Sequence, residues 1–228
     1  QRSGVACALP WPRRGGLDNR RWRGELQARY SAQAPAAAQF QAGDVPRAAA
    51  QALDGARELV RALVLGGAAC VWDDVDAALE LGEFDMVCAC NDIGAHWPGR
   101  LDHWVSLHPE KLPGWAVWRE QKGYPGGYVT WGHRASSYVQ KWTPDWGGSS
   151  GLLATKVALE LGASRVVLAG VPISATSRHF VRKVPWHSAD GFRAGWTRNR
   201  SALGNVRSMS GWTREFLGAP DECWMEHK

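Results

Sequence analysis

The sequence of 228 residues has no hydrophobic run long enough to cross a membrane. Its longest apolar stretch covers residues 62–72 and includes two glycines, well short of the roughly 18 residues that a spanning helix needs. The apolar segment at residues 5–9 precedes its neighbouring arginines, which is the reverse of the order in a secretory signal. Five cysteines, spread through a long chain, do not form the pattern of a disulfide scaffold. These absences favour a cytoplasmic protein.

A net positive charge is missing from most of the chain. The 27 Lys and Arg exceed the 22 Asp and Glu by five, and residues 1–57 alone carry nine Arg and four acidic residues. Residues 58–228 are therefore neutral, and the basic pI does not favour a nucleic-acid partner. The leading segment, 1–57, is rich in Ala and Arg and predicts a poorly ordered tail or linker, with nucleic-acid binding as the alternative.

From residue 60 onward, short β-branched runs alternate with helical segments. Strands are predicted at 60–65, 84–90, 101–107, 127–131 and 165–169, with a weak strand near 205–209. Helices are predicted at 73–81, 109–121 with an interruption near Pro113-Gly114, 150–161, 188–203 and from residue 212. This alternation predicts an α/β fold for 58–228: a single doubly wound, mostly parallel, Rossmann-like sheet with helices on both faces. No oligomeric state is indicated.

In such a sheet, ligands bind at the carboxyl ends of the strands. Gly66 and Gly67 follow the first predicted strand and could bring backbone N–H groups to a phosphate, although a plain tight turn explains them equally well. Asn91 and Asp92 follow the second strand, where they could contact a nucleobase or ribose or else cap a turn. Both pairs are candidate nucleotide-binding residues.

Two further segments belong to the same predicted edge. The string GGSSG, residues 147–151, opens a buried helix, so Ser149 or Ser150 is a natural N-cap and the first turn is a possible anion site. The connection 171–190 is basic: residues 178–214 hold eight Lys or Arg and one acid, whereas residues 62–99 hold seven acids and neither Lys nor Arg. This polarity indicates either a basic lid over an anionic ligand or a solvated basic face.

The histidines do not predict a metal centre. His96, His103 and His108 match no known zinc spacing, so we expect no metal ligands among them. Four acids, Asp73, Asp74, Asp76 and Asp92, could hold Mg²⁺ in a phosphoryl-transfer enzyme, or simply place charge at a helix N-terminus. His187, next to Ser188, is a candidate general base.

The segments in their order resemble a known superfamily. ALVLGGAACVWDDVDAAL, DMVCACNDIG, DHWVSLHPEKL, GGSSGLLATKVALELGASRVVLAGVPIS and PWHSAD together are similar to the bacterial sialyltransferases of the Campylobacter type and the related 6-hydroxymethylpterin diphosphokinase-like proteins. The resemblance is distant, spans about residues 61–200 and is most specific at 149–170.

The resemblance implies a role for each matching residue. Gly66, Gly67 and Ala69 would line the nucleotide, Asn91 would contact the ribose or leaving phosphate, Ser149, Ser150 and Gly151 would hold the nucleotide, and His187 would deprotonate the acceptor. The chain departs from the family at Ala69-Cys70, which replaces Pro-Ser, and at His108, which replaces an Asn. Residues 171–186 contain no Tyr, so Arg178, Arg182 or Lys183 would have to assist the leaving phosphate by charge.

Three functions follow as hypotheses. The first is a nucleotide-sugar-dependent glycosyltransferase that inverts configuration without a metal cofactor, using a His base, a nucleotide-sugar donor and a hydroxyl acceptor. The second is an ATP-dependent pyrophosphokinase-like enzyme, which would require Mg²⁺. The third is a nucleotide- or nucleic-acid-binding protein without catalysis.

Overall fold

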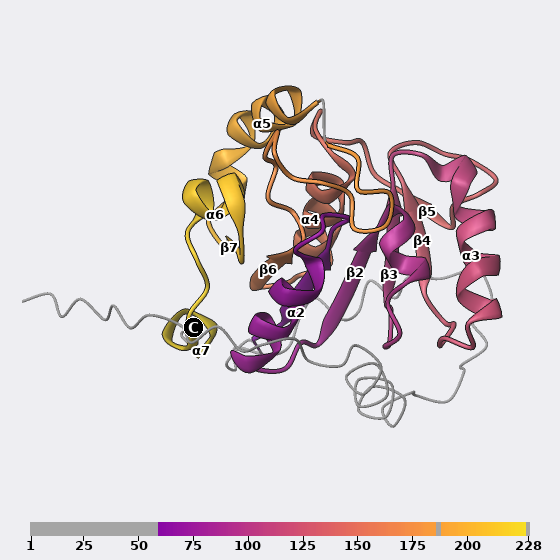
Figure 1. Ribbon diagram of the computed structural model, residues 1–228, viewed down its shortest axis with the longest axis horizontal. Helices are drawn as coiled ribbons and strands as arrows, with labels where there is room; N and C mark the ends of the chain where they lie inside the picture. The colour runs from indigo at the N-terminus through magenta and orange to yellow at the C-terminus, as the bar shows by residue number, and fades with distance from the viewer. Residues whose placement is uncertain (1–58, 186–187, 227–228) are drawn as a thin grey trace, which may run out of the picture.

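The computed structural model describes residues 59–185 and 188–226 (Figure 1). The predicted tail, residues 1–57, and the predicted base, His187, lie outside the described residues. No helix in the described part of the chain is both long and apolar enough to cross a membrane.

A parallel sheet of seven strands forms the centre of the described structure. The strands are β1 (Arg61–Leu65), β2 (Met86–Cys90), β3 (His103–Ser106), β4 (Val129–Gly132), β5 (Lys141–Trp142), β6 (Arg165–Ala169) and β7 (Val206–Ser208). Their spatial order is β5-β4-β3-β2-β1-β6-β7. The chain therefore builds outward from β1 to β5 and then returns to the other side of β1, which places the topological switch point between β1 and β6.

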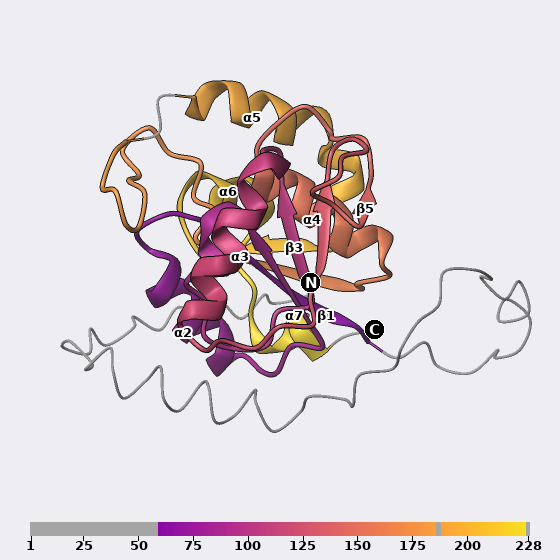
Figure 2. The same ribbon diagram turned by 90° about the vertical axis from the view of Figure 1, so that its right-hand side faces the viewer.

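Helices cover both faces of the sheet, because alternate residues of each buried strand point to opposite sides. In β1, Leu63 and Leu65 belong to the hydrophobic core beneath α2 (Val71–Glu80) and α3 (Leu112–Gln121). Helix α7 (Glu222–Glu226) packs against the same core. Ala62 and Val64 join the opposite core with α4 (Ser150–Glu160), α5 (Ala189–Arg198) and α6 (Gly211–Leu217). Figure 2 shows α2 and α3 on one side of the strands and α4 on the other. The predicted doubly wound α/β fold is confirmed.

Several local predictions need correction. The interruption predicted near Pro113-Gly114 is wrong, because α3 runs without a break from Leu112 after the short 3₁₀ turn η3 (Pro109–Lys111). Pro113 sits in the first helical turn, where a missing N–H costs no hydrogen bond. The predicted helix 188–203 is α5 followed by a 3₁₀ turn, η4 (Arg200–Leu203). The edge strand β5 and helix α7 have too few residues to show a pattern in the sequence.

Two glycines permit a close crossing at the switch point. A Cβ on Gly66 would lie 2.3 Å from the carbonyl oxygen of Gly170, and a Cβ on Gly170 would lie 2.6 Å from Cβ of Val71. Gly170 also has a φ of 70°, which side chains disfavour. The ends of β1 and β6 therefore approach each other through bare backbone.

Candidate functional site

A cavity of about 350 Å³ lies at the carboxyl ends of the strands, at the switch point. Gly66, Gly67 and Gly170 form part of its lining where β1 and β6 end. Asn91 and Asp92 line it from the end of β2. This is the position that the fold class favours for ligands.

Most backbone N–H groups of the glycine turn, residues 66–70, donate hydrogen bonds to carbonyls within the protein. The N–H of Gly66 donates to the Ala169 carbonyl at 2.8 Å, that of Ala68 to Gly170 at 3.1 Å, and that of Ala69 to Arg178 at 2.7 Å. The Gly67 carbonyl accepts from the N–H of Phe180 at 3.0 Å, so the turn pairs with the connection after β6. Ala69 is exposed and does not line the cavity. The turn is thus chiefly a docking edge for that connection.

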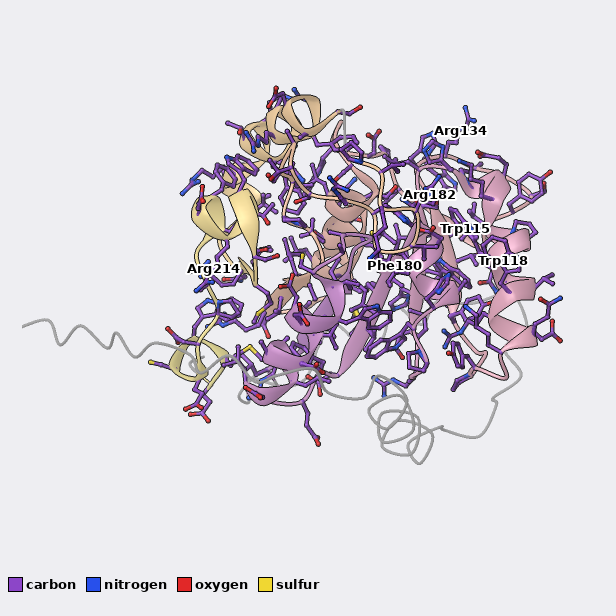
Figure 3. The ribbon with its side chains drawn as sticks, viewed as in Figure 1. Trp115, Trp118, Arg134, Phe180, Arg182 and Arg214 are labelled. Carbon is purple, nitrogen blue, oxygen red and sulfur yellow. The ribbon has the colours of Figure 1, made fainter. Side chains whose placement is uncertain are left out.

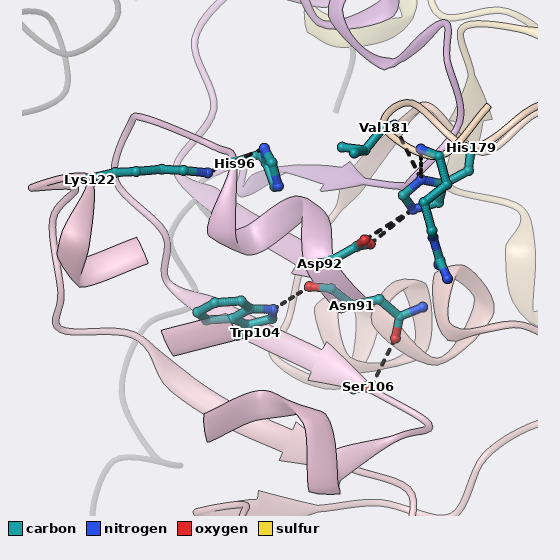
Figure 4. Close-up of polar contacts among 9 residues, drawn as sticks. Asn91, Asp92, His96, Trp104, Ser106, Lys122, His179 and Val181 are labelled. Carbon is teal, nitrogen blue, oxygen red and sulfur yellow. Dashed lines mark hydrogen bonds and ion pairs between the residues drawn. The ribbon is translucent and has the colours of Figure 1, made fainter. Parts of the chain in front are cut away.

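Asn91 is held in an unusual conformation beside the cavity. It opens the 3₁₀ turn η2 (Asn91–Ala95) with a φ of 58°, in the left-handed region that Asn tolerates better than most residues. The indole N–H of Trp104 donates to its carbonyl at 2.6 Å. The Ser106 hydroxyl donates to its Oδ1 at 2.8 Å, because an amide oxygen can only accept (Figure 4). Ser106 Oγ in turn accepts the N–H of His108. Neither N–H of the Asn91 amide has a partner among residues 59–185 and 188–226, so both remain for a ligand.

Asp92, the next residue, turns to a different partner. Its two carboxylate oxygens lie 3.2 and 3.1 Å from Nε2 of His179 (Figure 4). The backbone N–H groups of Val181 and Arg182 donate to Nδ1 of His179 at 3.2 Å each, so the proton of the neutral ring is on Nε2. Burial raises the pKa of Asp92, but the hydrogen bond from His179 and the nearby charge of Arg182 outweigh burial and lower it. Asp92 is a carboxylate that ties the connection to η2.

The N-terminus of α4 supplies further donors to the cavity. Ser149 is the N-cap, as the sequence predicts, and its Oγ accepts from the N–H of Leu152 at 3.3 Å. Ser150 Oγ accepts from the N–H of Leu107 at 3.3 Å, which ties the helix start to the end of β3. Ser150 and Gly151 line the cavity, and their N–H groups precede the first intrahelical bond, from Leu153 to Ser149. The positive end of the helix dipole therefore lies at this part of the cavity lining.

The charged side chains around the cavity favour an anion. Arg182 and Lys111 line it, and the single carboxylate among its described lining residues is Asp92, which already pairs with His179. Figure 3 shows Arg182 beside Trp115, which lines the same cavity. Of the other predicted lid cations, Arg178 and Lys183 do not line it.

The acidic residues considered for Mg²⁺ do not converge. The buried Asp74 accepts from the N–H of Gly170 at 2.8 Å and from the Ser210 hydroxyl at 2.6 Å. It therefore joins the start of α2 to the segments that follow β6 and β7. Burial raises the pKa of Asp74 and that of the neighbouring Cys70 thiol, the latter to about 12. Within 59–185 and 188–226, no three His, Cys, Asp or Glu side chains are placed to hold a metal ion.

Several lining residues were not predicted as ligand-binding residues from the sequence. His108 and Lys111 lie just after β3, and Phe192 lies on α5. His108 and Lys111 follow the third strand as Asn91 follows the second, so the rule of strand carboxyl ends could have found them. No comparable signal marks Phe192, because its place depends on how α5 packs across the sheet.

The fold and cavity define the class of protein: a Rossmann-like α/β domain with an anion-compatible cleft at its switch point. Comparison of the chain with models of known families, with curated proteins and with solved structures finds no match.

Proposed function

We propose that the protein is a nucleotide-sugar-dependent transferase whose donor binds in the cavity at the switch point. The observation that carries this proposal is that two sets of donor groups belong to the lining of that cavity. One is the Asn91 amide, oriented by Ser106, and the other is the first turn of α4 at Ser150 and Gly151. Together they suit a phosphate more than a neutral ligand.

The same groups suit the chemistry of transfer. When the bond from the sugar to the phosphate breaks, negative charge grows on the departing phosphate oxygen. Fixed donors at the N-terminus of α4 and on Asn91 would stabilise that charge without having to reorganise. Arg182 lies at the cavity and would add a cation, which is the role that the sequence resemblance left open for this residue.

The surroundings of Asn91 support a functional role. An Asn with positive φ stores strain, and glycine would relieve it at no steric cost. Its amide is oriented by the completely buried hydroxyl of Ser106, and its backbone carbonyl is held by the Trp104 indole. A position that needed only a turn would not require an oriented amide.

A thermal-shift panel tests the proposal on the purified full chain. CMP, UDP, GDP and ATP are each added with and without Mg²⁺ at about 100 times the dissociation constant, which stabilises a folded state by about 2.7 kcal/mol. We expect one nucleotide to raise the Tm by roughly 5–10 °C without needing Mg²⁺. Release of free nucleotide from the matching sugar nucleotide then tests catalysis.

Asn91→Ala links the result to the site. Loss of its two donors should weaken binding of the selected nucleotide about tenfold, or roughly 1.4 kcal/mol. Gln121→Ala is the matched control, because it removes an exposed amide on α3 that does not line the cavity. Equal affinity of Asn91→Ala and wild type would reject the site, and a shift with ATP only in the presence of Mg²⁺ would favour the pyrophosphokinase alternative.

A further inference from the structure

Two histidines line the cavity among those that the structure describes, and they differ in what their rings can do. Both nitrogens of His179 are committed, Nε2 to Asp92 and Nδ1 to two backbone N–H groups. Its side chain is 8% exposed, so it has neither a free lone pair nor much access to a substrate. His179 is a structural tie between Asp92 and the connection after β6.

His108 has the opposite properties. Its side chain is 57% exposed while it lines the cavity, and its Nδ1 lies 3.7 Å from Oε1 of Glu110. No hydrogen bond to its Nε2 is formed by any residue in the described parts of the chain. A carboxylate beside one ring nitrogen favours a proton there and leaves the lone pair of the other nitrogen for a reaction.

The backbone of His108 is fixed to the groups that would receive the donor phosphate. Its N–H donates to Ser106 Oγ at 2.8 Å, and its carbonyl accepts from the N–H of Lys111 at 3.0 Å. Ser106 is also the residue that orients the Asn91 amide. One buried hydroxyl therefore sets both the start of the His108 side chain and the direction of the Asn91 donors.

We infer that His108 is the general base that deprotonates the acceptor hydroxyl, with Glu110 as its positioning residue. This assignment rests on the proposed function and differs from the sequence prediction of His187, which lies outside the described residues. His108 Nε2 would take the hydroxyl proton as the acceptor oxygen bonds to the anomeric carbon. The bond from that carbon to the phosphate oxygen breaks, and its electron pair leaves with the nucleotide. The imidazolium then returns its proton to solvent.

The test uses the full-length protein and the nucleotide that gives wild type the largest thermal shift. The sugar conjugates of that nucleotide are the substrates, with water as acceptor, and released nucleotide is measured. The variants are His108→Ala, His108→Gln, Glu110→Gln and His187→Ala, and His133→Ala is the control, because His133 does not line the cavity. Nucleotide Kd is measured for each, so that binding and turnover are separated.

We expect His108→Ala and His108→Gln to lower kcat at least 100-fold and to leave nucleotide Kd within threefold of wild type. Added imidazole should restore part of the activity of His108→Ala, which a merely structural defect would not allow. Glu110→Gln should cost less, about tenfold in kcat. A loss confined to His187→Ala, or His108 variants within threefold of wild type, overturns the assignment of the base and leaves the nucleotide site standing. Wild type that binds no nucleotide overturns the proposed function and this assignment with it.

Discussion

The glycine turn at residues 66–70 and the turn η2 follow neighbouring strands at the same edge of the sheet, yet they do different work. The glycine turn uses its backbone donors on Ala169, Gly170 and Arg178. In η2, hydrogen bonds from Trp104 and Ser106 hold Asn91 so that its amide donors are left for a ligand. The glycine turn thus contributes mainly to packing, whereas the strained Asn91 lines the cavity with amide donors that no described residue uses.

The difference shows that a turn can line the cavity while most of its backbone polar groups are already hydrogen-bonded within the protein. Gly66 and Gly67 line the cavity, but the connection after β6 pairs with this turn at Ala68 and His179 and occupies its polar edge. A buried guanidinium, that of Arg119, supports η2 from behind through the carbonyls of Gly94, Trp97 and Gly99. Each turn can therefore be broken separately.

The largest effect should come from removing the support of η2. Arg119 is 1% exposed, and its guanidinium also donates to the Pro125 carbonyl at 2.8 Å. Burial lowers its pKa to about 10, which still leaves it charged at neutral pH. Arg119→Met would leave four carbonyls without a donor and should lower the free energy of unfolding by about 4 kcal/mol, measured by urea denaturation.

Arg134→Met is the control for that experiment. Arg134 is exposed, so its replacement should change the free energy of unfolding by less than about 0.5 kcal/mol. A loss below about 1 kcal/mol in Arg119→Met would show that η2 keeps its shape without the guanidinium.

A smaller loss of unfolding free energy should follow from adding a side chain where the ends of β1 and β6 approach each other. Gly170→Ala places a Cβ 2.7 Å from the Gly66 carbonyl oxygen and 2.6 Å from Cβ of Val71, at a φ of 70°. The overlap and the strained φ should together cost about 3 kcal/mol of unfolding free energy. Gly191→Ala, in α5 with nothing within 4 Å of the added Cβ, should be neutral or slightly stabilising. Equal stability of the two variants would contradict a tight crossing.

The smallest effects concern pH, and the two turns should respond in opposite directions. The pKa of Asp74, just after the glycine turn, is raised above its ordinary value of 3.8, chiefly by burial. The folded state then binds this proton more readily than the unfolded state, so the stabilisation from Asp74 grows as the pH falls from neutral toward 3.8. Relative to Asp74→Asn, the wild-type protein should gain stability over that interval.

Asp92, in η2, should show the reverse. Its pKa lies below 3.8, so the stabilisation it gives is complete above 3.8 and is lost as the pH falls further. Denaturant unfolding of wild type, Asp74→Asn and Asp92→Asn between pH 3 and 7 measures both differences. The same sign of slope for both carboxylates would contradict the contrast between the two turns.

The order of strands and helices could be predicted because each element has its own pattern of apolar, polar and capping residues within a short stretch of sequence. The run RVVLA, residues 165–169, is apolar after Arg165 and becomes β6 with the predicted bounds, since a central parallel strand is buried on both faces. Ser149 could be predicted as an N-cap because capping needs only the next three residues. The two-residue strand β5 could not, because two residues carry no period.

The candidate site was only partly accessible to such arguments. Asn91 and the GGSSG segment lie at strand and helix ends, so the fold class alone brings them to the cavity edge. The hydrogen bond between Asp92 and His179 joins residues 87 positions apart, and the sequence around neither residue predicts it. For the same reason Ala69 could be mistaken for a lining residue, since its partner Arg178 lies far along the chain.

Local patterns in the sequence are enough to give the class of fold, the neutral charge of residues 58–228 and the edge of the sheet where polar residues gather. These follow from periodicity, composition and caps, which act over a few neighbouring residues. Which of those polar groups remain for a ligand depends on long-range contacts, because each donor or acceptor is either bonded or left unbonded by segments that are distant in the sequence. Within the described residues, Asn91 and His108 keep unpaired side-chain nitrogens beside one buried hydroxyl, whereas the glycine turn uses most of its backbone donors inside the protein.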